Sequence, residues 1–309
     1  MLRTSLRTMA GSNRVEQLVT STPLSKGIVD RFVAGESAGD AVAAASELAA
    51  DGLWISLDRL GEDTLDKQQA AAAVAAYRDV LAQLADAGLT PAAEVSLKLS
   101  AVGQALGPDG DAIALDNARL VCQAARDAGT TVTFDMEDHT TTDSTLDVLT
   151  AVRRDFPETG GVLQAYLRRT EGDCKDLAYA GSRVRLCKGA YKQPESVAYQ
   201  SRGDVDRSYV RCLRVLMNGV GYPMVATHDP RLVRIASMLA GRAQRDAGSF
   251  EYQMLYGVRP DEQRRLAASG ETMRVYVPYG DQWYGYLMRR LAERPQNLTF
   301  FARSLLSRS

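Results

Sequence analysis

Eight short runs rich in β-branched and aromatic residues alternate with longer helical stretches, and this alternation constrains the fold more than any other feature. The runs lie at 53–57, 94–99, 131–136, 161–166, 183–187, 224–228, 250–254 and 274–278. Alternating strands and helices predict βαβ units around a parallel sheet. Eight such units are the number found in a (β/α)8 barrel, so the pattern predicts that α/β fold.

Helices are predicted between and before these runs. Those of the barrel are expected at 64–88, 116–128, 143–155, 173–181, 194–218, 230–247, 260–269 and 281–294. The first is rich in alanine and ends on Gly88, as expected of a helix with a C-terminal glycine. Segments of helical character also precede the first strand, near 14–19, 26–35 and 38–52. We therefore predict an N-terminal helical arm over 1–50, covering the barrel floor or supporting a partner contact, and a catalytic barrel domain over 51–309.

A doubly wound sheet is the alternative α/β fold. It would require a phosphate-binding glycine fingerprint directly after the first strand. The sequence there reads DRLGEDT, which lacks that fingerprint. The barrel is therefore the favoured prediction.

Composition excludes several classes of protein. Lys and Arg total 37 against 38 Asp and Glu, so the positive charge expected of a nucleic-acid-binding protein is absent. The 4 cysteines have no CxxC spacing and there are 2 histidines, which argues against a disulfide framework and a tetrahedral zinc site and fits the cytoplasm. No apolar run approaches the roughly 18 residues of a transmembrane helix.

Functional side chains end nearly every predicted strand. In such barrels the active site lies at the carboxyl ends of the strands, so these positions are informative. They are Asp58, Lys98, Asp135, Gln164, Arg185 followed by Lys188, His228, Gln253 and Tyr276. Strands also end in polar loops, so a purely structural role is the alternative for each residue taken singly.

Two of these strand ends predict particular chemistry. Lys98 interrupts an otherwise apolar or hydroxyl-bearing strand, and a lysine inside a barrel must find a carboxylate or lose its charge. Asp135, one strand along, is the nearest candidate partner, and a purely structural Lys–Asp pair is the alternative. Arg185, Lys188 and a glycine lie together at the end of the fifth predicted strand, which predicts a bound anion such as a phosphate or pyrophosphate. His228 is either part of this site or a hydrogen-bonded core histidine.

The stretch YGYLMRRLAE places Tyr286, Arg289, Arg290 and Glu293 on one face of a helix, at positions i, i+3, i+4 and i+7. One interpretation is a solvated face with an Arg289–Glu293 pair. The other is a bidentate clamp for a carboxylate, for which arginine is better suited than lysine.

The ordered motifs VSLKLSA, FDMED, QAYL, RVRLCKGAY, ATHD, FEYQMLYG, RVYVPYG and YGYLMRRLAE resemble those of the proline dehydrogenase family. The likeness runs from about residue 53 to 303 in family order. The chain ends soon after the last motif, so the resemblance is to the monofunctional bacterial form. It implies a distorted (β/α)8 barrel of the TIM type, with the last helix over the barrel mouth and FAD bound noncovalently at the carboxyl ends of the strands.

The resemblance also implies roles for individual residues. Lys98, Arg289 and Arg290 bind the substrate carboxylate, while Tyr276 and Tyr286 pack around the proline ring. Asp135 and Arg185 are the catalytic pair near the flavin N5 edge, and Glu293 supports an arginine of the clamp. The residues that hold FAD are Met136, Gln164, Arg185, Lys188, Gly189, Ala190, Thr227 and His228.

The implied reaction is the oxidation of L-proline to Δ1-pyrroline-5-carboxylate by hydride transfer to FAD, the first step of proline catabolism to glutamate. The resemblance implies a quinone as electron acceptor, and hence a cytoplasmic protein with peripheral contact at the inner face of the cell membrane. Two alternatives remain. One is a Schiff-base or phosphate-binding barrel lyase with Lys98 or Lys188 as the amine. The other is a non-catalytic carboxylate-binding barrel.

Overall fold

Eight parallel strands close into one barrel in sequence order, with β8 paired to β1. The computed structural model describes residues 23–61 and 64–293. The strands are β1 (Trp54–Arg59), β2 (Ala93–Leu97), β3 (Val132–Phe134), β4 (Gly160–Gln164), β5 (Arg183–Cys187), β6 (Tyr222–Ala226), β7 (Glu251–Leu255) and β8 (Met273–Tyr279). Each predicted run overlaps an observed strand, and the predicted (β/α)8 barrel is confirmed.

Helices follow the strands as predicted, with some ends displaced. They are α3 (Pro23–Phe32), α4 (Ala38–Ala50), α5 (Lys67–Asp86), α6 (Gly110–Asp127), α7 (Thr142–Val152), α8 (Thr170–Asp176), α9 (Arg202–Asn218), α10 (Pro230–Arg242), α11 (Pro260–Ala268) and α12 (Trp283–Glu293). The prediction began α9 at 194, too early. Ser201 is its N-cap and accepts a hydrogen bond from the Asp204 amide, so the helix starts there.

The apolar core lies between the barrel and the surrounding helices. On β2, Val95 and Leu97 are fully buried in this core, together with Leu81 and Leu84 of α5. The intervening strand residues instead meet one another inside the barrel, as Ser56 and Ser96 do at 3.1 Å between their hydroxyl oxygens. Because successive strand residues face opposite sides, the apolar residues hold the helices on and the polar residues fill the barrel.

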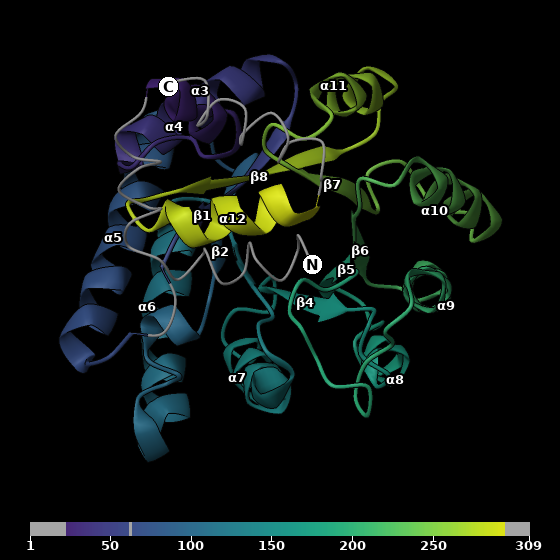
Figure 1. Cartoon of the computed structure of the whole chain (residues 1–309), viewed down its shortest axis with the longest axis horizontal. Helices are drawn as coiled ribbons and strands as arrows, with labels where there is room; N and C mark the ends of the chain where they lie inside the picture. Colours follow the sequence, from purple (N-terminus) through teal and green to yellow (C-terminus); the bar gives the residue numbers. More distant parts are fainter. Residues whose placement is uncertain (1–22, 62–63, 294–309) are drawn as a thin grey trace, which may run out of the picture.

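The arm contributes to the barrel wall and to the mouth. Helix α4 packs against β1, β8 and α5, and Figure 1 shows it taking its place with α5 to α11 in the ring around the strands. The turn after α3 lies at the carboxyl end of β8, where the Ala34 amide donates to the Pro278 carbonyl at 2.9 Å. For the described residues, the expected position across the floor is therefore wrong. The predicted segment 14–19 lies outside them, and the domain boundary near residue 51 stays a prediction.

Helix α12 leaves the ring and lies in front of the strands in Figure 1. Its buried side chains pack on the end of α3 and on Leu60, which directly follows β1; they are Trp283, Tyr284, Tyr286, Leu287 and Met288. The Trp283 indole also donates to the Glu36 carboxylate at 3.1 Å. The last helix thus lies over the barrel mouth, as expected. Within 23–61 and 64–293, no helix combines the length and the apolar character needed to cross a bilayer.

Candidate active site

The barrel interior is polar, whereas such barrels are usually filled by bulky aliphatic side chains. Polar residues recur at every second position on or directly after the strands, which places them on one face. They are Ser56 and Asp58, then Glu94, Ser96 and Lys98, then Thr133 and Asp135, Arg183 and Arg185, Glu251 and Gln253, and Arg274 and Tyr276. Their contacts across the interior form two layers.

The layer nearer the floor is built from paired charges. Glu94, fully buried, accepts from Arg183 Nη2 at 2.7 Å and from Thr133 Oγ1 at 2.9 Å. Glu251 binds Arg274 through two hydrogen bonds, of 2.8 and 3.1 Å. Burial acts to raise the pKa of Glu94, but the charges of Arg183, Arg274 and Arg185 outweigh it and lower that pKa to about 2. The floor therefore holds the ionised Glu94 carboxylate beside three guanidinium groups.

Arg185 is the centre of the layer nearer the mouth. It is 4% exposed, and each of its nitrogens has a protein partner. Nε donates to Gln253 Oε1 at 2.6 Å, and Nη1 donates to Asp135 Oδ1 at 2.7 Å and to Ser96 Oγ at 2.8 Å. Nη2 donates to Ser56 Oγ at 3.1 Å. The guanidinium plane is held from several strands at once.

Asp135 and Tyr276 complete this layer. The Tyr276 hydroxyl donates to Asp135 Oδ2 at 2.7 Å, and the Arg185 guanidinium carbon lies 5.2 Å from the centre of the Tyr276 ring. Burial raises the pKa of Asp135 against the opposing charges of Arg185 and Lys98. Burial, followed by the charge of Asp135, raises the pKa of Tyr276 well above its usual value, so its hydroxyl stays protonated and able to donate.

Lys98 forms its ion pair with Asp58, at 2.5 Å between Nζ and Oδ1, and not with Asp135 as the sequence suggested. The side chains are 8% and 2% exposed. The prediction failed because β2 has a neighbour on each side, and the sequence order offered no reason to choose β1 over β3. The Asp135 carboxylate instead accepts hydrogen bonds from Arg185 and Tyr276.

A second polar group lies beyond the ends of β5 and β6. Lys188 Nζ is 2.5 Å from Asp206 Oδ1 and 3.6 Å from Asp229 Oδ2. Arg231 joins the same two carboxylates, at 3.2 and 2.8 Å. Both cations proposed from sequence to bind an anion, Arg185 and Lys188, thus have carboxylate partners within the protein, and a bound anion would share them.

The remaining residues assigned to the cofactor lie around this group. Gly189 has a φ of +109°, and a Cβ there would lie 2.5 Å from the Tyr166 ring, so the turn requires glycine. Ala190 is exposed, and Met136 and Thr227 are buried. Gln164 Nε2 donates to the Glu137 carbonyl at 2.8 Å. His228 Nε2 accepts from the Leu255 amide at 2.9 Å, so the neutral ring carries its proton on Nδ1.

On α12, Tyr286 is 6% exposed and the Arg290 guanidinium carbon lies 5.2 Å from the centre of its ring. The side chains of Arg289 and Glu293 lie outside the described residues. The proposed two-arginine clamp and its support by Glu293 therefore remain predictions.

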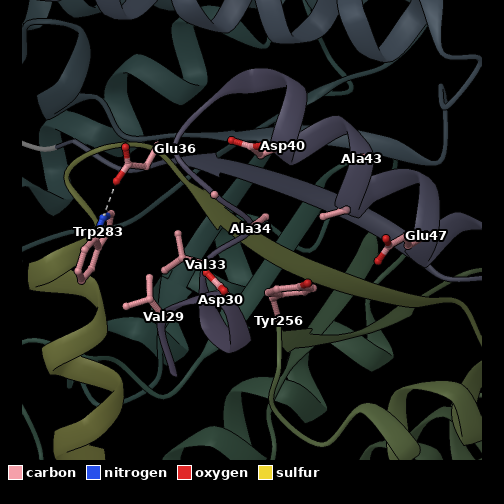
Figure 2. Close-up of a pocket in the computed structure, with 12 residues that line it drawn as sticks. Val29, Asp30, Val33, Ala34, Glu36, Asp40, Ala43, Glu47, Tyr256 and Trp283 are labelled. Atoms are coloured by element: carbon pink, nitrogen blue, oxygen red, sulfur yellow. Dashed lines mark hydrogen bonds between the residues drawn. The ribbon is translucent and has the colours of Figure 1, made fainter. Parts of the chain in front are cut away.

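A cavity of about 730 Å³ lies outside the barrel, between the arm and the start of α12. Figure 2 shows Asp30, Glu36, Asp40 and Glu47 around it, with Trp283 bonded to Glu36. None of the residues assigned to the site from sequence lines this cavity. The chemistry-bearing residues are in the barrel interior and at its mouth instead.

The floor layer was not predicted from the sequence. Glu94, Arg183, Glu251 and Arg274 were not assigned, and neither were Ser56 and Ser96, which bind Arg185. A signal was present, since Glu94 lies four residues before the assigned Lys98 and each of the others lies two residues before an assigned position. Charged residues at i and i+2 on a strand that otherwise reads as apolar indicate a second polar layer on the same face.

Comparisons with known proteins agree with the sequence motifs. The family model described as proline dehydrogenase matches residues 41–303. The chain is 39% identical to a proline dehydrogenase of Deinococcus radiodurans, covering 99% of this chain and 98% of the relative. It is 37% identical to proline dehydrogenase 2 of Bacillus subtilis, covering 87% and 88%.

A comparison with a solved structure agrees with these sequence matches. Proline utilization A of Bdellovibrio bacteriovorus, inactivated by N-propargylglycine, superposes with a TM-score of 0.79 at 26% identity. The match covers 86% of this chain and 32% of that one. With a family model that spans most of the sequence and relatives that align over nearly their full length, the chain belongs to the proline dehydrogenase family.

Proposed function

We propose that this protein oxidises L-proline to Δ1-pyrroline-5-carboxylate with noncovalently bound FAD as hydride acceptor, in the first step of proline catabolism to glutamate. Membership of the family makes the chain an oxidoreductase that acts on proline. The observation that carries the finer proposal is the buried Lys98–Asp58 pair beside the Arg185–Asp135–Tyr276 cluster, at the strand ends beneath α12.

The residues at the ends of β4 to β6 fit a flavin dinucleotide. An amide, an ammonium group, a hydroxyl and an imidazole occur at or just after the ends of adjacent strands, at Gln164, Lys188, Thr227 and His228. This mixture suits a ligand that combines a polar heteroaromatic ring with phosphates. The Lys188–Ala190 turn lies close against β4, since Gly189 leaves no room for a Cβ beside Tyr166. Bound FAD would supply the two-electron acceptor.

Lys98 is suited to bind the carboxylate of the substrate. Asp58 orients the ammonium group of Lys98 through their ion pair. Because an ammonium group has three donors, it can bind a second carboxylate as well. Arg290, stacked on Tyr286, would approach the same carboxylate from α12. Arg289 is proposed as the second arginine of this clamp. Fixing the amino acid from two sides is a positioning effect that can lower the barrier by several kcal/mol.

The cationic surroundings also suit the reaction itself. Hydride leaves the ring carbon next to nitrogen, and the C=N bond forms only if the nitrogen lone pair is free. Positive charge from Lys98 and the arginines disfavours the ammonium form of bound proline. The rings of Tyr276 and Tyr286, both largely buried, would pack against the apolar part of the substrate. The hydrogen bond between Arg185 and Asp135 would hold both side chains in one orientation, beside the edge of the flavin that accepts the hydride.

The lyase alternative is less well supported. A Schiff base requires an amine that is free to attack a carbonyl carbon, yet Lys98 and Lys188 each lie 2.5 Å from a carboxylate oxygen and are engaged in ion pairs. The non-catalytic alternative gives no reason for a turn that only glycine can adopt at position 189 or for an arginine held at every nitrogen. Proline oxidation uses all of these features.

A quinone is proposed as the final electron acceptor, reached by peripheral contact of a cytoplasmic protein with the inner face of the membrane. This part rests on the family resemblance. The test is anaerobic: proline-reduced protein is mixed with vesicles that contain a quinone, and recovery of the oxidised flavin absorbance is followed. Reoxidation no faster than with quinone-free vesicles would contradict it.

The central test measures the flavin absorbance of the wild-type protein and the proline kinetics of an α12 variant. The purified protein should be yellow and should bleach anaerobically on addition of L-proline, whereas a colourless protein that stays inert after addition of FAD would contradict the proposal. Arg290→Met should retain the flavin and raise the KM for proline about 10- to 100-fold, as expected for loss of a charge-assisted hydrogen bond. Arg242→Met, at an exposed position on α10, is the matched control. Unchanged proline kinetics in the Arg290 variant would refute its role.

A further inference from the structure

We propose that Gln253 is a positioning residue for the reaction, because it fixes the plane of the Arg185 guanidinium by coupling it to the charged floor of the barrel. Gln253 lies on β7 and is 3% exposed. Its Oε1 accepts from Arg185 Nε at 2.6 Å, and its Nε2 donates to Glu251 Oε1 at 2.5 Å. The catalytic consequence, though not the coupling itself, rests on the proposed function.

The chemistry of the two neighbours selects an amide. A guanidinium can only donate hydrogen bonds and an ionised carboxylate can only accept them. A side chain between them must therefore accept on one side and donate on the other, as Gln253 does. Reversal of the amide would point its NH2 group at Arg185 and its oxygen at Glu251, so the amide has one stable orientation.

Glu251 is itself held firmly. Arg274 donates to its two oxygens at 2.8 and 3.1 Å, and the Tyr222 hydroxyl donates at 3.1 Å. Glu251 and Arg274 are 0% and 2% exposed. Gln253 therefore connects a rigid charge pair at the floor to the Arg185–Asp135–Tyr276 cluster at the mouth.

Gln253 holds the part of Arg185 that its other hydrogen-bond partners do not reach. Asp135 and Ser96 bind Nη1, and Ser56 binds Nη2, which also lies 3.6 Å from Glu94 Oε1. Contacts at the terminal nitrogens alone leave the guanidinium able to tilt about the line through them. The bond at Nε adds a third point, and three points fix a plane. Loss of Gln253 should thus change the orientation of Arg185, and with it that of Asp135, while the Lys98–Asp58 pair is unaffected.

The variant Gln253→Met keeps the length of the side chain and removes both hydrogen bonds. The rate of flavin reduction by proline, measured anaerobically by stopped flow, should fall about 10- to 100-fold, the scale of an ångström-sized misplacement. The Kd for proline should change less than about twofold, since the residues proposed to bind the carboxylate are unchanged. Gln263→Met, at another amide that is 2% exposed and binds only backbone carbonyls, is the control and should leave the rate unchanged.

A second readout does not depend on activity. In protein labelled with 15N-arginine, the Arg185 Nε–H resonance, assigned by its loss in Arg185→Lys, should be protected from exchange in the wild type and in Gln263→Met. It should lose that protection in Gln253→Met. If proline fails to reduce the wild-type flavin, the proposed function fails while this measurement still tests the coupling.

Exchanging the two partners provides a rescue. In Glu251→Gln/Gln253→Glu the carboxylate faces Arg185 and accepts from it, while the amide at position 251 donates to that carboxylate and accepts from Arg274 through its oxygen. The total charge is kept, the bond between the two side chains reverses its direction, and Arg274 retains one acceptor atom in place of two. This variant should recover most of the reduction rate and the Nε–H protection, and it tests the coupling even if Gln253→Met does not fold. Protection and a reduction rate unchanged in Gln253→Met, or a folded exchanged variant that shows no Nε–H protection and reduces the flavin no faster than Gln253→Met, would overturn the proposal.

Discussion

Glu94→Gln is expected to destabilise the protein by about 3 kcal/mol at pH 7, because it removes the negative charge that neighbouring arginines stabilise. The size of the side chain is unchanged, so the loss is electrostatic. Glu94 is 0% exposed, and its pKa is lowered from 4.5 to about 2 despite burial, by Arg183, Arg274 and Arg185. Each pKa unit corresponds to about 1.36 kcal/mol, and glutamine stands in for the protonated carboxyl. The lowered pKa means that Glu94 stabilises the fold fully above its unfolded-state value and loses this contribution as the pH falls towards 2.

The pH dependence separates this charge effect from a packing defect. With the same two pKa values, the contribution falls to roughly 2 kcal/mol at pH 3.5, so the gap between wild type and variant should narrow by more than about 1 kcal/mol. The assay is urea unfolding followed by circular dichroism at both pH values. Glu195→Gln, at an exposed position, is the control and should show no such gap. A gap of equal size at both pH values would refute the electrostatic account.

Two further predictions concern the mouth of the barrel. Lys98→Ala should abolish flavin reduction by proline and, by leaving Asp58 buried and unpaired, should cost about 3–5 kcal/mol of stability. Lys98→Ala/Asp58→Ala should regain much of that stability without regaining reduction; wild-type single-turnover reduction in either variant would show that the pair is only structural. Gly189→Ala should lower the retention of flavin and cost about 1–3 kcal/mol, because the added Cβ meets Tyr166. Gly52→Ala, also at positive φ but with open space around it, separates backbone strain from the clash, and equal loss in both variants would contradict the account.

The architecture could be predicted because strand and helix periodicity are local properties of the sequence. The ends of the helices were less predictable. At α9 the cap formed by Ser201 decides where the helix begins, although the sequence from 194 onward also suits a helix. The floor was one of two alternatives for the arm, and the sequence could not exclude it because nothing in the composition distinguishes a helix that lies along the wall of a barrel from one that lies across its base.

The site was predicted as a set of residues but not as a set of contacts. The carboxyl-end rule led to Lys98, Asp135, Arg185 and Tyr276, which do meet in one region. The partner of Lys98 was wrong, since strand neighbours depend on closure of the barrel. The bond between Ser56 and Arg185 joins residues 129 positions apart, and no local pattern encodes such a pairing. The floor layer was visible in the i, i+2 spacing, yet its charges belong to no motif.

Placing α4 in the ring beside β8 and β1 has a consequence for how this protein can change over evolution. In a barrel whose last helix seals the wall, substitutions in that helix alter stability and the active site together. Here the sealing is done by α4, while α12 carries Tyr286 and Arg290 over the mouth. Under the proposed function, residues of α12 that face the mouth can therefore vary to suit a different small amino acid without opening the wall of the barrel, although its buried side chains must still pack on α3 and Leu60.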